Sequence, residues 1–178
     1  MSGKDEKPDR RAPRPANKRG MARLAAVQAL YQMDVGGADL ASVMAEFEAF
    51  RLGREIEGEE YLPADADFFR DIMTGVVGAQ RRIDPRIHAA LTAAWPLKRL
   101  DATLRALLRS GCFELMQRRD GPARVVISEY VEVARAFFED GEEPRMVNGV
   151  LDTLAHQLRP DEFAEGGPDG DGRAGTGA

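Results

Sequence analysis

Residues 144–158 repeat apolar side chains at the spacing of an α-helix, and this pattern constrains the fold more than any other stretch. Four apolar residues fall at i, i+4, i+7 and i+11 of this segment, namely Val147, Leu151, Leu154 and Leu158. Side chains at this spacing share one face of a helix, and that face must be buried. The opposite side is polar and carries Arg145, Asn148, Asp152 and His156. The pattern therefore predicts an amphipathic helix that packs onto a core.

An Asn-Gly pair, Asn148 and Gly149, falls in the first turns of this predicted helix, where both residues are poor helix formers. Gly149 costs about 1 kcal/mol relative to alanine in a helix interior. One reason to keep a glycine there is a close approach of the backbone, either to another helix or to a ligand. The sequence leaves these two interpretations of Gly149 open.

The same period recurs along the chain and predicts an all-α fold of about seven helices. The expected helices cover about 18–34, 40–51, a stretch that starts at Asp65 or Asp67, 85–94, 98–118, 123–138 and 144–159. Glycine and proline mark the breaks, as in Gly36-Gly37 and Trp95-Pro96. Residues 52–64 hold two glycines, a proline and many charges, and are predicted to form a loop.

Composition supports one helical domain between two disordered ends. The chain has 178 residues, of which 43% are hydrophobic, which is enough to bury a core. Only 7% are aromatic, which favours helix over sheet. We expect a folded domain at residues 17–163, a disordered basic arm at 1–16 and a disordered glycine-rich tail at 164–178. The arm has three prolines among charges, and the tail has six glycines and no large apolar group.

Charge is distributed unevenly along the chain. Residues 1–23 hold eight Lys and Arg against three Asp and Glu, a net charge of +5, whereas residues 24–178 hold 17 against 27, a net charge of −10. Lys18, Arg19 and Arg23 fall in the first two turns of a helix that Asn17 can cap. Cations there oppose the helix dipole, while the helix end itself favours an anion. We therefore prefer nucleic-acid binding over a merely solubilising arm.

The sequence carries no recognisable catalytic or metal-binding motif. Two histidines and one cysteine cannot supply an ordinary zinc site, and Cys112 lies on an apolar stripe, as a core residue does. Phosphate-binding glycine loops and the nucleophile elbow of hydrolases are also missing. We expect no cofactor and no enzymatic activity. The sequence also lacks a signal peptide and any apolar run of the roughly 20 residues that span a bilayer, which favours a cytoplasmic protein without membrane contact.

Over residues 18–160 the sequence resembles the NusB family of bacterial transcription antitermination factors. Four blocks in the family's order carry the resemblance. They are Ala22-Arg23 leading into Ala26-Val27-Gln28-Ala29-Leu30-Tyr31; Phe69-Arg70-Asp71-Ile72 with Gly75-Val76; Leu108-Arg109 with Phe113-Glu114-Leu115; and Val126-Ile127-Ser128-Glu129-Tyr130-Val131-Glu132-Val133-Ala134 leading into Val147-Asn148-Gly149-Val150-Leu151-Asp152. The last block is the most specific.

This resemblance implies two packed helical subdomains, at about 17–80 and 81–163, and a binding protein rather than an enzyme. The family binds the single-stranded boxA element of ribosomal RNA leader transcripts as a heterodimer with NusE, a ribosomal small-subunit protein. That complex joins the RNA polymerase elongation complex and suppresses termination. The same role is therefore expected of this chain.

The resemblance also implies where the RNA and the partner bind. The expected RNA-binding residues are those at the starts of the first and last helices: Lys18, Arg19, Arg23, Arg145, Met146 and Asn148. Family members often carry arginine where this chain has Gly20 and Met21, and an aromatic residue where it has Met146, which stacks less well on a base. Tyr31 matches a family position near the NusE surface, although a buried core tyrosine is an equally good interpretation.

Two other functions remain open from the sequence. One is a NusB-like regulatory domain of the kind fused to ribosomal RNA cytosine methyltransferases, which carry a Rossmann-like domain downstream. The glycine-rich stretch that follows the helices here argues against that enzyme. The other is a helical protein–protein adaptor whose basic arm is incidental, and RNA binding separates it from the antitermination factor.

Overall fold

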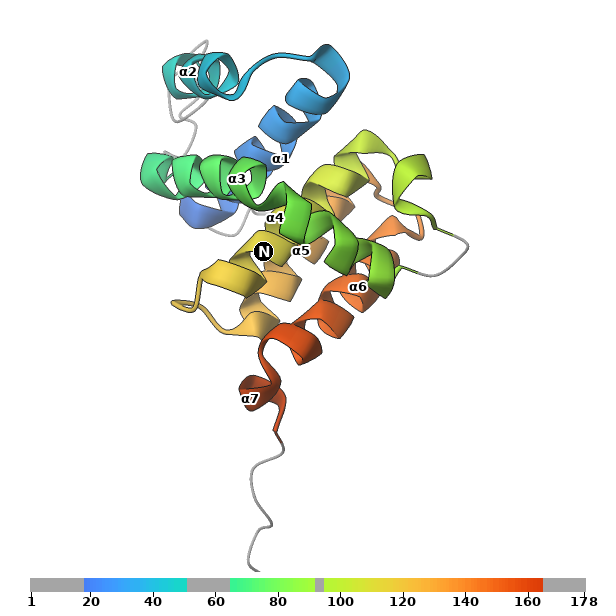
Figure 1. Cartoon of the computed structure of the whole chain (residues 1–178). Helices are drawn as coiled ribbons and strands as arrows, with labels where there is room; N and C mark the ends of the chain where they lie inside the picture. Colours follow the sequence, from blue (N-terminus) through green and yellow to red (C-terminus); the bar gives the residue numbers. More distant parts are fainter. Residues whose placement is uncertain (1–17, 51–64, 92–94, 165–178) are drawn as a thin grey trace, which may run out of the picture.

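The computed structural model describes residues 18–50, 65–91 and 95–164 (Figure 1). All regular elements of the described residues are helical, which confirms the predicted all-α fold. They are α1 (Lys18–Gly36), α2 (Leu40–Phe50), α3 (Ala66–Ala90), the short 3₁₀ helix η1 (Leu97–Arg99), α4 (Ala102–Gln117), α5 (Ala123–Phe137), α6 (Glu143–Leu158) and α7 (Pro160–Phe163). The predicted arm, the cap at Asn17, the loop at 52–64 and all of the predicted tail except Ala164 lie outside the described residues.

Local signals in the sequence set several of the helix ends. Gly37 adopts a φ of 68°, a left-handed conformation that glycine reaches without strain, directly after α1 ends. The Asp65 carboxylate accepts a hydrogen bond from the Phe68 amide at the start of α3. Asp101 does the same for Thr103 at the start of α4. These aspartates satisfy amides that the first turn of a helix leaves unpaired.

Helix α3 corrects one prediction, because residues 66–90 form a single helix where the sequence predicted two. Pro85 lies inside α3, not at the start of a new helix. An internal proline costs about 3 kcal/mol, but Ile83 and Ile87 on either side of it are both completely buried. Their burial continues the stripe begun by Ile72 and Val76, and this packing outweighs the lost hydrogen bond. The helix also runs through the predicted subdomain boundary at residues 80 and 81 without a break.

Smaller differences occur around α4 and at the end of the chain. Helix α4 begins at Ala102 rather than at residue 98, because Asp101 caps it and residues 97–99 form η1. Helix α6 ends before Pro160, as predicted, and the short α7 that follows was not predicted. A four-residue helix is too short for its apolar period to be recognised in a sequence.

Helix α4 forms the centre of the molecule and packs against α1, α3, α5 and α6 (Figure 1). Its Leu104, Leu107 and Leu108 are almost completely buried. The apolar stripe of α6 faces this core, since Val147, Leu151 and Leu154 are inaccessible to solvent. The amphipathic helix predicted for residues 144–159 is thus confirmed. None of the helices in the described ranges is long and apolar enough to cross a bilayer.

A close contact between α3 and α4 leads to a test of the packing. A Cβ atom at Gly75 would lie 2.1 Å from the ring of Phe113, which is buried and has no room to move. Gly75→Ala should therefore lower the free energy of unfolding by about 1–3 kcal/mol. Gly78 lies on the same helix, and a Cβ atom there would have nothing within 4 Å. Gly78→Ala should therefore raise the free energy of unfolding by up to about 1 kcal/mol. Urea denaturation of both variants measures these changes. Equal changes in the free energy of unfolding would contradict the close contact between Gly75 and Phe113.

Candidate nucleic-acid interface

The start of α1 brings two of the predicted RNA-binding residues to the surface. Lys18 is exposed, and its backbone carbonyl accepts a hydrogen bond of 3.0 Å from the Asp65 amide, which ties α1 to the start of α3. The Arg19 side chain is 40% exposed and forms a 2.8 Å ion pair with Asp120. Arg19 therefore lies where the start of α1 meets the turn between α4 and α5, and Lys18 lies beside the start of α3.

Arg23 has a different environment from the one predicted. Only 5% of the residue is exposed, and its guanidinium donates two hydrogen bonds of 2.9 Å to Glu114 on α4. Glu129 on α5 lies 3.7 Å away. Burial alone lowers the pKa of Arg23, but the hydrogen bonds and charge of Glu114 outweigh burial and raise it, so the residue stays cationic. Arg23 is thus a buried ion-pair partner that joins three helices, and this corrects its assignment as an exposed phosphate contact.

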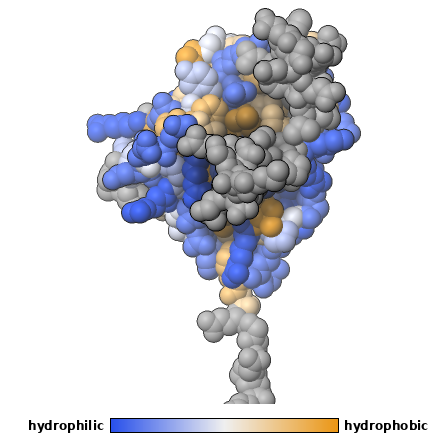
Figure 2. All heavy atoms as spheres, turned by 180° about the vertical axis from the view of Figure 1, so that it is seen from behind, coloured by the Kyte–Doolittle hydropathy of each residue, from blue (hydrophilic) through white to orange (hydrophobic). Residues whose placement is uncertain are grey.

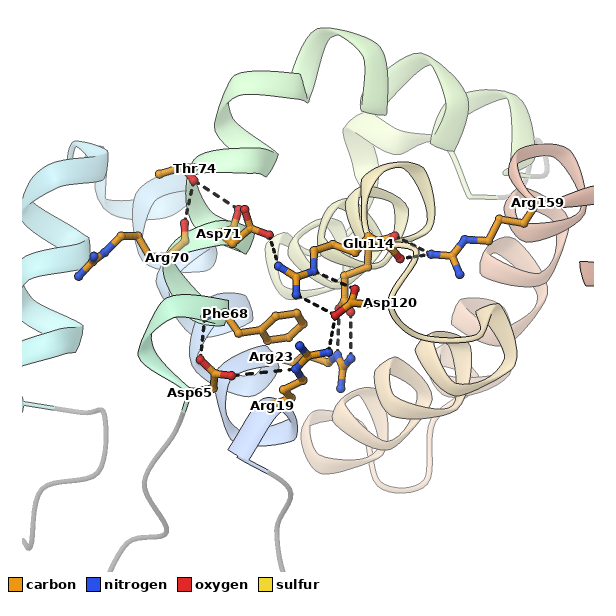
Figure 3. A network of polar contacts seen from close by, with 11 residues as sticks. Arg19, Arg23, Asp65, Phe68, Arg70, Asp71, Thr74, Glu114, Asp120 and Arg159 are labelled. Carbon is orange, nitrogen blue, oxygen red and sulfur yellow. Dashed lines mark hydrogen bonds and ion pairs between the residues drawn. The ribbon is translucent and has the colours of Figure 1, made fainter.

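A cluster of arginines surrounds the ring of Phe68 near the start of α3 (Figure 3). The guanidinium carbons of Arg19, Arg23 and Arg118 lie 4.8, 5.0 and 4.9 Å from the ring centroid. Arginine over an aromatic face is a favourable cation–π geometry. We call Arg19, Arg118, Phe68 and Asp120 the Phe68 cluster. The ring holds the guanidinium groups in place, and the carboxylates around them balance their charge.

The start of α6 borders a groove of about 530 Å³ that it forms with the end of α3 and the segment before η1. We call it the α6 groove, and its lining includes Leu91, Trp95, Glu142, Arg145, Met146 and Gly149. Arg145 is exposed, while Met146 and Trp95 are half-buried. Pro144 in the first turn removes one amide that would otherwise need a partner, and the Glu142 side chain makes no capping hydrogen bond. The groove thus combines an apolar wall, a cation and a helix N-terminus.

Gly149 forms part of the floor of the α6 groove. A Cβ atom at Gly149 would meet nothing within 4 Å, so no helix of the described chain packs against it. The interpretation as a glycine needed for helix packing is therefore wrong. Asn148 points elsewhere and lines a second groove between α5 and α6, together with Ser128 and Asp152. Of the three residues predicted at the start of α6, the structure brings Arg145 and Met146 together and separates Asn148 from them.

Tyr31 lies in a third groove, of about 560 Å³, between the end of α1, the start of α4 and the end of α5. We call it the Tyr31 groove. Tyr31 is 41% exposed, so the interpretation as a core residue is wrong. Val35 and Phe137 also line the groove and are 61% and 38% exposed. The face seen in Figure 2 is mostly hydrophilic, with apolar residues in separate areas. Three exposed apolar side chains around one groove are typical of a protein-docking surface.

The described residues contain no group of three or more His, Cys, Asp and Glu side chains placed to hold a metal ion. Cys112 is completely buried, and burial raises the pKa of its thiol to about 12, so it is a core residue as predicted. Trp95 lines the α6 groove and Arg118 belongs to the Phe68 cluster, and the sequence pattern predicted neither of them as a site residue. In that pattern Trp95 served only as a helix-ending signal, although an aromatic residue next to a predicted RNA helix could have suggested a stacking role. Arg118 gave no such signal, because Asp71 and Phe68, which it contacts, lie far from it in the sequence, although Asp120 is only two positions away.

The NusB family model matches residues 21–156, which is most of the chain. The chain belongs to the NusB family. The transcription antitermination protein NusB of Rhodopseudomonas palustris (strain BisB18) is 59% identical to it over 162 residues, which cover 91% of this chain and 95% of that protein. The predicted family and its function class, transcription antitermination, are therefore confirmed.

Solved structures of the NusB family share the fold. A structure of T. maritima NusB has 27% sequence identity and a TM-score of 0.66, covering 82% of this chain and 96% of that one. A structure of the antitermination factors NusB and NusE in complex with double-stranded RNA has 21% identity and a TM-score of 0.65, covering 79% and 97%. At that identity the second likeness shows the fold alone.

Proposed function

We propose that this NusB-family chain binds single-stranded boxA RNA together with NusE, and that the complex joins the RNA polymerase elongation complex to suppress termination. The chain then acts in the cytoplasm as a binding protein rather than as an enzyme. A NusB of the same fold has been solved with NusE and double-stranded RNA, which supports NusE and an RNA as partners. The α6 groove is the observation that carries the RNA part of the proposal.

The α6 groove has the chemistry that single-stranded RNA needs. Trp95 and Met146 offer apolar surface against which an unstacked base packs, and base–aromatic stacking contributes about 1–3 kcal/mol. Arg145 at the N-terminus of α6 suits the adjoining phosphate. Gly149 leaves the floor open, which lets a base approach the helix backbone. Lys18 and Arg19 at the start of α1 supply further contacts to the RNA backbone.

The Tyr31 groove has the chemistry of a protein partner. Its exposed apolar side chains would lose contact with water on binding, which supplies affinity. A ribosomal protein such as NusE is basic, and residues 24–178 carry a net charge of −10, which speeds the encounter. We therefore assign NusE to this groove and RNA to the α6 groove and the start of α1. The two partners then occupy different surfaces and bind at the same time.

Native mass spectrometry of the chain with cognate NusE and a boxA oligonucleotide tests this function. We expect a one-to-one-to-one complex, and tighter RNA binding by the pair than by the chain alone. Tyr31→Glu places a charge in the apolar groove and should weaken NusE binding by about tenfold or more, while RNA binding by the chain alone stays unchanged. Val125→Glu is the matched control, because Val125 is 47% exposed outside the Tyr31 groove. NusE binding without RNA binding would favour the adaptor function instead.

A further inference from the structure

Asp120 is an exposed carboxylate held by two arginines in the Phe68 cluster (Figure 3). Arg118 donates from Nε to Oδ1 at 3.2 Å and from Nη2 to Oδ2 at 2.9 Å, and Arg19 donates from Nη1 to Oδ2 at 2.8 Å. The Asp120 side chain is nevertheless 44% exposed, and those of Arg19 and Arg118 are 40% and 25% exposed. The arrangement is therefore a two-arginine fork that opens to solvent and already contains an anionic group.

The fork is fixed in place before any ligand arrives. Both guanidinium groups lie over the ring of Phe68, which is 3% exposed and anchored in the core. Arg118 is also tied to Asp71 by a 2.7 Å hydrogen bond. Hydrogen bonds from Arg118 and then Arg19 hold the pKa of Asp120 well below its usual range, so its carboxylate stays charged at neutral pH.

The arginines around Phe68 carry no surplus of positive charge. The three guanidinium groups there pair with five carboxylates of the described chain, namely Asp65, Asp71, Glu114, Asp120 and Glu129. An RNA phosphate can gain full contact with Arg19 and Arg118 only by taking the place of a carboxylate. Asp120 is the one that both arginines share. A forked guanidinium binds a phosphate with the same geometry as a carboxylate.

We infer that Arg19 and Arg118 form a phosphate-binding site for the RNA backbone, and that Asp120 is its built-in competitor. This inference rests on the proposed function and adds Arg118 to the RNA contacts. When RNA binds, one phosphate displaces the Asp120 carboxylate from both arginines and releases its own counterions. RNA that lacks a base suited to the α6 groove binds too weakly to displace Asp120. The competitor thus suppresses sequence-independent binding through the Phe68 cluster.

The test compares Asp120→Asn with Asp71→Asn in RNA titrations at several salt concentrations. Asp120→Asn should tighten binding of boxA RNA at every salt concentration, because no carboxylate then has to leave the two arginines. The gain in affinity should be roughly twofold to thirtyfold, the contribution of the two exposed ion pairs that RNA breaks in the wild-type chain. The salt slope should stay near the wild-type value, because the same phosphate is contacted in both proteins. Asp71→Asn is the matched control, because Asp71 has the same exposure and also pairs with Arg118. Its affinity for boxA RNA should stay near the wild-type value, since the phosphate must still displace Asp120 from both arginines.

Three results would overturn the inference. Weaker RNA binding by a folded Asp120→Asn protein would mean that Asp120 only positions the arginines. An equal increase in RNA affinity for Asp120→Asn and Asp71→Asn would mean a general effect of removing one negative charge. If Asp120→Asn does not fold, Arg118→Gln decides, since an unchanged salt slope in that variant would exclude Arg118 from the RNA contacts.

A titration with tripolyphosphate separates this inference from the proposed function. Asp120→Asn should bind this anion more tightly than Asp71→Asn does, whether or not the chain recognises boxA RNA. Equal affinity of the two variants for tripolyphosphate would show that Arg19 and Arg118 do not form a phosphate-binding site. Failure of the wild-type chain to bind boxA RNA, with the expected difference in tripolyphosphate binding, would instead count against the proposed function alone.

Discussion

Arg23→Ala should lower the free energy of unfolding by about 3–5 kcal/mol, which is the largest effect expected of any substitution discussed here. The change leaves the Glu114 side chain, which is 2% exposed, as a buried charge without its main partner. Urea denaturation measures the effect. Arg135→Ala is the control, because Arg135 and Glu132 form an ion pair on the surface of α5 whose loss should leave stability nearly unchanged.

The same comparison decides what Arg23 does for RNA binding. At a temperature at which both proteins remain folded, Arg23→Ala should bind RNA with the wild-type salt slope, because the buried guanidinium does not reach a phosphate. If Arg23→Ala kept the wild-type unfolding midpoint and showed a flatter salt slope, Arg23 would be an RNA contact rather than a buried structural ion pair. Replacing Arg23 and Glu114 together with apolar residues should restore much of the lost stability, because neither charge is then left unpaired.

Gly149→Leu should weaken RNA binding by roughly fivefold to a hundredfold while making the protein more stable. A leucine side chain fills the floor of the α6 groove and excludes the base, whose stacking contributes about 1–3 kcal/mol. The same change removes a poor helix former from α6 and should raise the free energy of unfolding by about 0.5–1 kcal/mol. Fluorescence anisotropy with a boxA oligonucleotide and urea denaturation measure the two effects.

The matched control for this prediction is Gly78→Leu. Gly78 is also an exposed helical glycine with open space around it, but it lies on α3 and outside the α6 groove. Its replacement should bring a similar gain in stability and leave RNA affinity unchanged. Unchanged RNA binding in both variants would show that no base occupies the α6 groove, whereas equal losses in both would indicate an effect that does not depend on the groove.

Gly149 shows what a pattern of good and poor helix formers can predict and what it cannot. The sequence marked Gly149 as an unfavourable residue that needed a reason, and it offered helix packing or ligand approach. Local propensity could not choose between them, because both explanations concern atoms outside the helix. Local propensity was equally uninformative about Gly75 and Phe113, whose close contact joins two different helices, α3 and α4.

The sequence by itself determined the features that depend on neighbours in the chain. The apolar period of 3.6 residues predicted helices and the buried face of α6, including Val147 and Leu151. Short-range signals such as Asp65 and Gly37 marked helix ends, because capping and left-handed turns involve only a few successive residues. The ordered motif blocks were sufficient to indicate the NusB family, and the family match confirms it.

The tertiary structure alone decided which charged and aromatic residues are available to a ligand. Arg19 and Arg23 are four residues apart on one helix, yet the first reaches solvent and the second is buried. The reason is Glu114, which lies 91 residues further along the chain and reaches Arg23 only in the folded state. Packing likewise explains why α3 continues past Pro85 without a break. Burial of several side chains together contributes more than the local cost of about 1 kcal/mol for an ordinary residue or about 3 kcal/mol for an internal proline, so long-range contacts prevail where the two conflict.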